Sequence, residues 1–304
     1  LGAAGNTVTK MARHFVDEAD LVFGIGSSFT TNLASMNIPD GKILVQTTID
    51  AKDLNKEHDL DHAVIGDCQL VLDQLIEEIM SQSGDAGRQD SGIVAEVAKV
   101  KDEWLEEWLP LLTSEEVPIN PYRIIWDLMH TVDRDNTVVT HDSGHPRDQL
   151  IPFWESTVPR GYLGWGNSTQ LGYSLGLVLG AKLASPDKTF INFMGDAAIG
   201  MAGMDLETGV RLNIPVLTIV LNNQVLSGYP SRYKDAVDGY RFTELYGEYA
   251  NVANALGAYG ERVSDTSQII PAFKRAFAEM DQGRPALLEF MTSEENRLSR
   301  YPAK

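Results

Sequence analysis

Cysteine is nearly absent from this sequence, since Cys68 is the only one in 304 residues. A single cysteine excludes an internal disulfide and a metal site built on a cysteine pair, and it fits a reducing compartment. Long apolar runs are also missing: the run VLTIVL is bounded by Pro215 and Asn222, well short of the roughly 20 residues that a membrane-spanning helix needs. We therefore expect no membrane span and a cytoplasmic location.

Basic residues are in the minority. The sequence has 25 Lys and Arg against 43 Asp and Glu, which gives a formal net charge of -18 and a pI near 4.6. Such a charge repels phosphate backbones, and no Lys/Arg cluster with interleaved aromatic residues would override it locally. We expect no nucleic-acid partner. The 43% hydrophobic content is enough to fill the cores of two ordinary domains.

Apolar and amphipathic segments alternate along the first half of the chain, as in a parallel α/β sheet. The predicted elements are a helix over 7–17, strands over 21–26 and 42–49, and a helix over 68–80. The segment 81–92 has no aliphatic residue larger than Ala and is the best linker candidate. A helix over 93–112 should stop near Pro110, and the next helix should carry Pro121 in its first turn.

The same alternation returns in the second half. The predicted strands cover 136–142, 188–194, 216–223 and 286–291, and the predicted helices lie near 172–184, 204–212, 246–256 and 271–280. The fold class is therefore α/β, with two doubly wound parallel-sheet domains. We place the first domain at residues 1–80, a linker and connecting helix at 81–118, and the second domain at 119–304.

Two polar sites follow predicted strands of the second domain. Asp196 comes after one strand and Asn223 after the next, and small residues surround Asp196. Strand ends in open α/β sheets bind ligands, and small residues let the backbone approach a phosphate. A carboxylate beside a phosphate requires a cation between them, and Mg²⁺ accepts such oxygens. Alternatively, Asp196 is a helix N-cap and Asn222-Asn223 a polar turn.

A long motif carries a resemblance. The stretch GDAAIGMAGMDLETGVRLNIPVLTIVLNNQ, from Gly195 to Gln224, resembles the Gly-Asp-Gly to Asn-Asn signature of thiamine diphosphate enzymes of the acetolactate synthase, oxalyl-CoA decarboxylase and 2-oxo acid decarboxylase type. The resemblance implies that Asp196, Asn223 and the Val225 carbonyl ligate Mg²⁺. It also implies that Gly195 and the backbone N–H groups of Ala197 and Ala198 hold the diphosphate of the cofactor. Ala197 stands where the commonest motif has Gly.

Two further segments are similar to cofactor-contacting parts of this family. In GWGNSTQLGYSLGLVLGAKLA the resemblance makes Leu171 the residue that supports the bent form of the cofactor, with the Thr169 carbonyl facing its aminopyrimidine. In THDSGHPRDQ it makes Ser143, Gly144 and His145 cofactor contacts. Simple helix-core packing remains an alternative for Leu171. A solvent-facing loop position remains one for His145.

The first 80 residues resemble the middle domain of the same family, starting partway through it. Acetolactate synthases commonly have an Arg where this sequence has Gly26, so FAD is not expected. In the family, a glutamate on an N-terminal domain activates the cofactor, and no glutamate of this sequence can be given that role. We expect the natural protein to begin earlier, or a partner subunit to carry that domain. The resemblance further implies a homodimer or homotetramer.

The implied activity is that of a thiamine diphosphate- and Mg²⁺-dependent 2-oxo acid decarboxylase, lyase or carboligase, with a 2-oxo acid or acyl-CoA substrate. The segment 224–242 is rich in Tyr and Arg and reads as a mobile lid. Arg232, Lys234 and Arg241 could pair there with a carboxylate or a CoA phosphate, or could belong to an ordinary solvated loop. The alternative function is a non-catalytic or regulatory α/β protein that binds another phosphorylated ligand.

Overall fold

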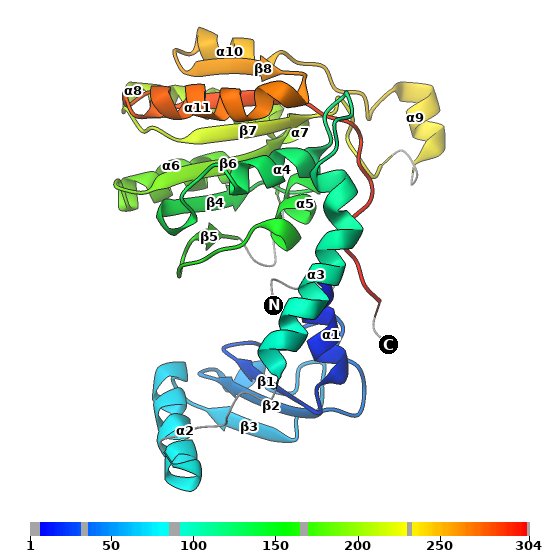
Figure 1. Cartoon of the computed structure of the whole chain (residues 1–304), viewed down its shortest axis with the longest axis vertical. Coiled ribbons are helices and arrows are strands. Elements are labelled where there is room, and N and C mark those ends of the chain that lie inside the picture. The colour runs from blue at the N-terminus through cyan, green and yellow to red at the C-terminus, as the bar shows by residue number, and fades with distance from the viewer. Residues whose placement is uncertain (1–6, 32–35, 85–91, 165–169, 230–232, 303–304) are drawn as a thin grey trace. The chain divides into compact units, whose positions relative to one another are not determined.

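A computed structural model shows the arrangement of these segments. It describes residues 7–31, 36–84, 92–164, 170–229 and 233–302. The chain divides into two compact units, residues 1–107 with 299–304 and residues 108–298. Each unit is built on a parallel sheet (Figure 1), which confirms the predicted α/β class. The border between the units falls inside the segment 81–118, which the sequence assigns to the connection.

The first unit has a three-stranded sheet in the order β1-β2-β3, with both strand pairs parallel. Its elements are α1 (Lys10–Glu18), β1 (Leu21–Ile25), β2 (Ile43–Thr48), the 3-10 turn η1 (Ala51–Asp53), β3 (His62–Ile65) and α2 (Cys68–Ser83). Thr9 caps α1 by accepting the Ala12 N–H at 3.1 Å. This cap explains why the helix predicted from residue 7 begins at Lys10.

Helix α3 (Ile93–Leu112) continues through Pro110. The predicted helix over 93–112 is confirmed, and it ends two residues after Pro110. A proline inside a helix removes one N–H donor to the preceding turn, and its ring crowds the carbonyl of that turn, which destabilises the helix. Packing compensates within the second unit, where Trp108 is 1% exposed and contacts Tyr122 edge-on, with the ring centroids 5.2 Å apart.

The second unit has a six-stranded, wholly parallel sheet in the order β5-β4-β6-β7-β9-β8. Its strands are β4 (Thr137–His141), β5 (Tyr162–Leu163), β6 (Thr189–Gly195), β7 (Leu217–Asn222), β8 (Tyr259–Val263) and β9 (Ala286–Met291). The chain runs from β4 to the edge strand β5 and then returns to β6 on the other side of β4. Strand order reverses there, and ligands bind outside the carboxyl ends of strands at such a switch point.

Helices cover both faces of this sheet. They are α4 (Pro121–Met129), α5 (His145–Phe153), α6 (Tyr173–Ala184), α7 (Asp196–Ala202), α8 (Leu206–Arg211), α9 (Lys234–Tyr240), α10 (Tyr249–Ala255) and α11 (Ile269–Met280), with 3-10 turns η2 (Arg134–Asn136), η3 (Gly203–Asp205) and η4 (Thr266–Gln268). Helices α6, α7 and α10 pack on one face, and α4, α5 and α11 pack together on the other. None of the helices in the described ranges is long and apolar enough to cross a membrane.

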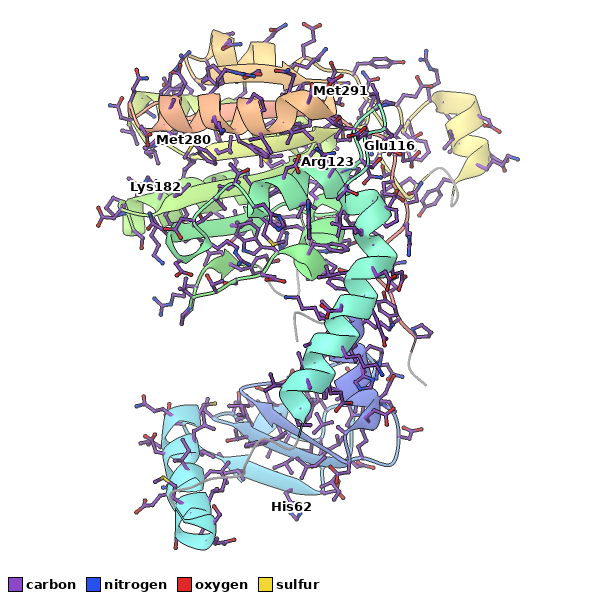
Figure 2. The ribbon with its side chains drawn as sticks, viewed as in Figure 1. His62, Glu116, Arg123, Lys182, Met280 and Met291 are labelled. Carbon is purple, nitrogen blue, oxygen red and sulfur yellow. The ribbon has the colours of Figure 1, made fainter. Side chains whose placement is uncertain are left out.

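In the second unit, the two ends of the parallel strands can be told apart by the residues that lie near them. Figure 2 shows Met291, at the carboxyl end of β9, on one side of the second unit, and Met280 and Lys182 on the opposite side. Helix α9 projects on the same side as Met291 (Figure 1). The loops that follow the strands therefore gather on the Met291 side, at the carboxyl ends of the strands, where the predicted ligand site should lie.

Candidate functional site

A cavity of about 390 Å³ lies at the carboxyl ends of β4, β6 and β7. The sequence assigns eleven residues to the cofactor or metal, and ten of them line this cavity: Ser143, Gly144, His145, Leu171, Gly195, Asp196, Ala197, Ala198, Asn223 and Val225. The eleventh, Thr169, lies outside the described residues. The structure thus brings four separate segments of the sequence together at the carboxyl ends of β4, β6 and β7: residues 143–145, 171, 195–198 and 223–225.

Asp196 is the first residue of α7 and is only 4% exposed. Gly195, not Asp196, occupies the N-cap position of this helix. The Asp196 carboxylate accepts the N–H of Ala197 and, through its other oxygen, the N–H of Gln224, both at 2.8 Å. Burial raises the pKa of Asp196 to about 6, against the opposing effect of these hydrogen bonds. A bound cation would stabilise the charged form of such a buried carboxylate.

The loop after β7 brings two further oxygens to the cavity. Asn223 Oδ1 accepts the Val225 N–H at 3.0 Å, and Asn223 Nδ2 donates to Ser227 Oγ at 2.8 Å. Between them Gln224 has a φ of 61°, in the left-handed region, so the chain turns sharply at this point. Asp196, the Asn223 amide and the Val225 carbonyl offer oxygen atoms only, which is the donor set that Mg²⁺ prefers.

The loop after β4 forms another side of the cavity. Gly144 has φ 85° and ψ -148°, a conformation that residues with a Cβ rarely adopt, and it precedes α5. His145 is partly buried and lines the cavity, so it is not simply a solvent-facing loop residue. The loops after β4 and β6 approach closely, since a Cβ on Gly195 would lie 3.6 Å from Pro146 Cγ.

Leu171 lies just before α6. It lines the cavity and also packs, partly buried, against the core cluster beneath α6 and α7. Both readings of Leu171 from the sequence therefore describe its surroundings. Gly172 has a φ of 87°, and a Cβ there would lie 3.0 Å from the Ala202 Cβ. This position needs glycine, which fixes how the chain enters α6.

Two fully buried carboxylates behind the cavity were not predicted. Asp142 follows β4 and Glu289 lies in β9, and both are 0% exposed. Glu289 accepts Asn222 Nδ2 at 2.7 Å, Arg262 at 3.0 Å and the Ala250 N–H at 2.9 Å. The sequence carried a signal for Glu289, because an acidic residue in the otherwise apolar strand ALLEFM must find partners inside the protein.

Comparisons with known proteins agree with this geometry. The model of the thiamine pyrophosphate enzyme C-terminal TPP binding domain matches residues 142–290, which include the whole predicted signature. The model of the thiamine pyrophosphate enzyme central domain matches residues 1–75. The chain belongs to the thiamine pyrophosphate enzyme superfamily. Its second unit contains the cofactor-binding domain of that superfamily, and its first unit contains the central domain.

Several relatives share most of this chain. The "Probable acetolactate synthase large subunit" of Methanococcus aeolicus is 24% identical over 99% of this chain and 52% of its own length. The "Acetolactate synthase large subunit IlvG" of Mycobacterium tuberculosis is 31% identical over 72% of this chain and 40% of its own. The "Sulfoacetaldehyde acetyltransferase" of Castellaniella defragrans is 26% identical over 97% of this chain and 53% of its own length. The chain thus spans about half the length of the curated relatives that it matches.

The segment 224–242 has several solvent-exposed parts. Helix α9 has no buried residue, and Figure 1 shows it set apart from the sheet. Tyr229 lines the cavity at the start of this segment. Arg232 lies outside the described residues. Arg241 donates to Glu244 and to Tyr246, so its guanidinium is already paired rather than facing a substrate carboxylate.

In the central domain, Gly26 follows β1 directly. Its φ is 61°, and a Cβ there would lie 3.5 Å from Cys68 Sγ. An arginine at this position, as acetolactate synthases commonly have, would be strained in this backbone conformation. The absence of FAD stays a prediction.

Proposed function

We propose that the cavity binds thiamine diphosphate together with Mg²⁺. The proposal extends to the complete protein, which would use this pair to break or form a carbon–carbon bond beside the carbonyl of a 2-oxo acid or acyl-CoA substrate. The observation that carries it is the meeting of Asp196, Asn223 and Val225 with Leu171 around one cavity. The spacing of the family motif and the chemistry of these side chains point to the same ligand.

Each side of the cavity has its own role in this proposal. The Asp196 carboxylate, the Asn223 amide oxygen and the Val225 carbonyl would hold Mg²⁺, which in turn would neutralise the diphosphate. Backbone N–H groups at Ala197 and Ala198 would contact the phosphate oxygens. The Ala197 N–H donates to Asp196 in this structure, so it would have to be shared or released when the ligand binds.

When bound, thiamine diphosphate would supply a nucleophilic carbon and an electron sink. The chain's contribution is to hold it and to keep water away from it. Leu171 and Ala198, on the cavity wall, are apolar, and apolar groups beside a bound ligand lower the local dielectric there. Whether the overall reaction is that of a lyase or of a transferase depends on the substrate that the remaining walls admit.

Cofactor activation would need a carboxylate from elsewhere. Among the described residues that line the cavity, Asp196 is the only one with a carboxylate, and this proposal gives it to the metal. We therefore propose that the activating glutamate belongs to another domain or to a partner subunit, in a homodimer, homotetramer or mixed assembly. Both arrangements would place the complete site between two protein surfaces.

Two measurements test this proposal. Protein purified with Mg²⁺ and thiamine diphosphate is denatured, and the released ligand is oxidised in the thiochrome assay. Native mass spectrometry of the same sample gives the mass of the assembly and its adducts. Fluorescent thiochrome and one cofactor per site support the proposal. A phosphorylated adduct without thiochrome would instead support the alternative that the protein binds a different phosphorylated ligand.

A further inference from the structure

Asp142 occupies an unusual place for a carboxylate. It is 0% exposed and directly follows β4. Its own N–H donates to the Phe193 carbonyl of β6 at 2.7 Å, which extends the pairing of the two strands by one residue. Its backbone is therefore held by the sheet at the switch point. A buried carboxylate costs free energy unless its oxygens are fully hydrogen-bonded, so its partners reveal what it stabilises.

Five hydrogen bonds from three residues satisfy this carboxylate. Oδ1 accepts the Ser143 N–H at 2.8 Å and the Gly172 N–H at 3.0 Å. Oδ2 accepts the Gly172 N–H at 3.1 Å, the Ser174 N–H at 3.1 Å and the Ser174 hydroxyl at 2.7 Å. These are neutral donors, four of the bonds coming from main-chain N–H groups. Such an arrangement fixes the path of the backbone rather than the position of another charged side chain.

The donors belong to two segments that both border the cavity. Ser143 begins the loop that continues with Gly144 and His145, and Gly172 directly follows Leu171. These segments are about 30 residues apart in the sequence, as the separation of Asp142 and Gly172 shows. The carboxylate of Asp142 is thus the shared acceptor that sets the distance between the His145 loop and Leu171.

We propose that Asp142 is a positioning residue for the thiamine end of the cofactor. It holds Leu171 and the Ser143–His145 loop, which together are here called the thiamine side of the cavity, at the separation that the bent cofactor needs. This inference rests on the proposed function and assigns a cause to the shape of one side of that site. The part of the cavity formed by Asp196, Asn223 and Val225, here called the metal side, makes none of the hydrogen bonds that Asp142 accepts in the described part of the chain.

A purely structural role makes a different prediction. Asp142 also supports the start of α6, where Ser174 is the second helical residue. If it only stabilised this helix, its loss would lower the melting temperature and weaken every ligand to the same extent. A positioning role instead separates two ligands. Mg²⁺ with inorganic diphosphate needs only the metal side, whereas Mg²⁺ with thiamine diphosphate needs both sides.

The experiment compares these two ligands in the complete protein by calorimetric titration. The variants are Asp142→Ala, Asp142→Asn and Ser174→Ala, with Asp127→Asn as the matched control. Asp127 is also a buried carboxylate, but it pairs with Arg123 on α4 and does not line the cavity. Asp142→Ala should weaken the binding of thiamine diphosphate by about tenfold or more, as is typical of a lost outer-shell contact. The affinity for inorganic diphosphate should stay within about twofold of wild type. Asp142→Asn keeps one acceptor oxygen and Ser174→Ala loses one bond, so both should have smaller effects in the same direction.

Hydrogen exchange without any ligand gives a second readout. The amides of Gly172 and Ser174 should exchange faster in Asp142→Ala than in wild type and in Asp127→Asn. Equal weakening of both ligands, or unchanged exchange at Gly172 and Ser174, would overturn the inference. If the wild-type protein binds neither ligand, the proposed function fails, and the exchange measurement still decides whether Asp142 holds these two segments.

Discussion

The two sides of the cavity rest on buried carboxylates that are satisfied in different ways. Behind the thiamine side, the donors to the Asp142 carboxylate within the described residues are neutral N–H and O–H groups. Behind the metal side, Glu289 has a cationic partner, Arg262, besides the Asn222 amide and the Ala250 N–H. The difference shows what each carboxylate fixes. Asp142 fixes a backbone path, and Glu289 fixes the Asn222 side chain beside the proposed metal ligand Asn223.

The metal side has a continuous chain of contacts. Glu289 holds the Asn222 amide, and Asn222 Oδ1 accepts the Gln224 N–H at 3.2 Å. That same N–H also donates to Asp196 at 2.8 Å. The turn that carries Asn223 and Val225 is thereby tied to β9 through side chains. The comparison predicts that changes on the two sides separate the binding of diphosphate from that of thiamine.

The largest effect should come from Asp196→Ala. Asp196 is the charged member of the proposed metal site, so its removal should weaken Mg²⁺-dependent binding of both inorganic diphosphate and thiamine diphosphate by more than about 100-fold. This exceeds the roughly 10- to 100-fold typical of losing an outer-shell partner. Calorimetric titration with and without Mg²⁺ measures this loss. Asp205→Ala, an exposed carboxylate in the following 3-10 turn, is the matched control and should bind as wild type. Retained binding by Asp196→Ala would disprove the metal assignment.

Glu289→Ala tests the metal side without touching a ligand. It leaves the buried Asn222 amide without an acceptor, so unfolding should become easier by about 1 to 3 kcal/mol. Inorganic diphosphate and thiamine diphosphate should both weaken by about tenfold, in contrast to Asp142→Ala. Glu261→Gln, on the neighbouring strand β8 and paired with Arg275, is the control. If Glu289→Ala spared inorganic diphosphate, the distinction between the two sides would be lost.

Much of the sheet could be predicted from the sequence because its central strands are apolar runs of ordinary length. The structure has β6 at Thr189–Gly195 and β9 at Ala286–Met291, against predictions of 188–194 and 286–291. Neither edge strand of the six-stranded sheet was predicted. Strand β5 has only two residues, and β8 is largely half-exposed. Such strands depend on their neighbours in the sheet rather than on their own pattern.

The site also contains residues that could be predicted from the sequence and one that could not. Asp196 and Asn223 were predictable because polar residues that follow apolar strands meet at one edge of a parallel sheet. Asp142 was not singled out, although it directly precedes the predicted Ser143. Its partners Gly172 and Ser174 lie far along the chain, and main-chain donors leave no trace in the choice of residue type. A contact that depends on the fold of two distant loops cannot be read from local spacing.

Leu171→Ala tests the thiamine side directly. The side chain is partly buried, so its truncation should cost about 1 to 2 kcal/mol of stability, below the range for a fully buried leucine. The binding of thiamine diphosphate should weaken about fivefold, which corresponds to roughly 1 kcal/mol, while the binding of inorganic diphosphate stays unchanged. Leu171→Met, which keeps the volume, should restore most of the binding. Equal binding of thiamine diphosphate to all three proteins would remove Leu171 from the site.

The smallest effect concerns pH and the residue next to Asp142. His141 is 1% exposed, its Nδ1 lies 3.0 Å from the Asp142 carbonyl oxygen, and its ring lies against Tyr162. Burial lowers the pKa of His141. In the unfolded chain a histidine takes up a proton near pH 6.5, whereas folded His141 does so only at lower pH, so protonation favours unfolding as the pH falls below about 6.5.

His141→Asn should therefore flatten the loss of stability between pH 7.5 and pH 5.5. The group contributes at most about 1.4 kcal/mol for each pH unit in this window, and denaturant unfolding of wild type and variant at several pH values measures the difference in slope. Because His141 lies on the thiamine side, the change should leave the binding of inorganic diphosphate at pH 7.5 within about twofold. Identical slopes would mean that folded His141 takes up its proton as readily as in the unfolded chain, and that the wall behind Asp142 admits water.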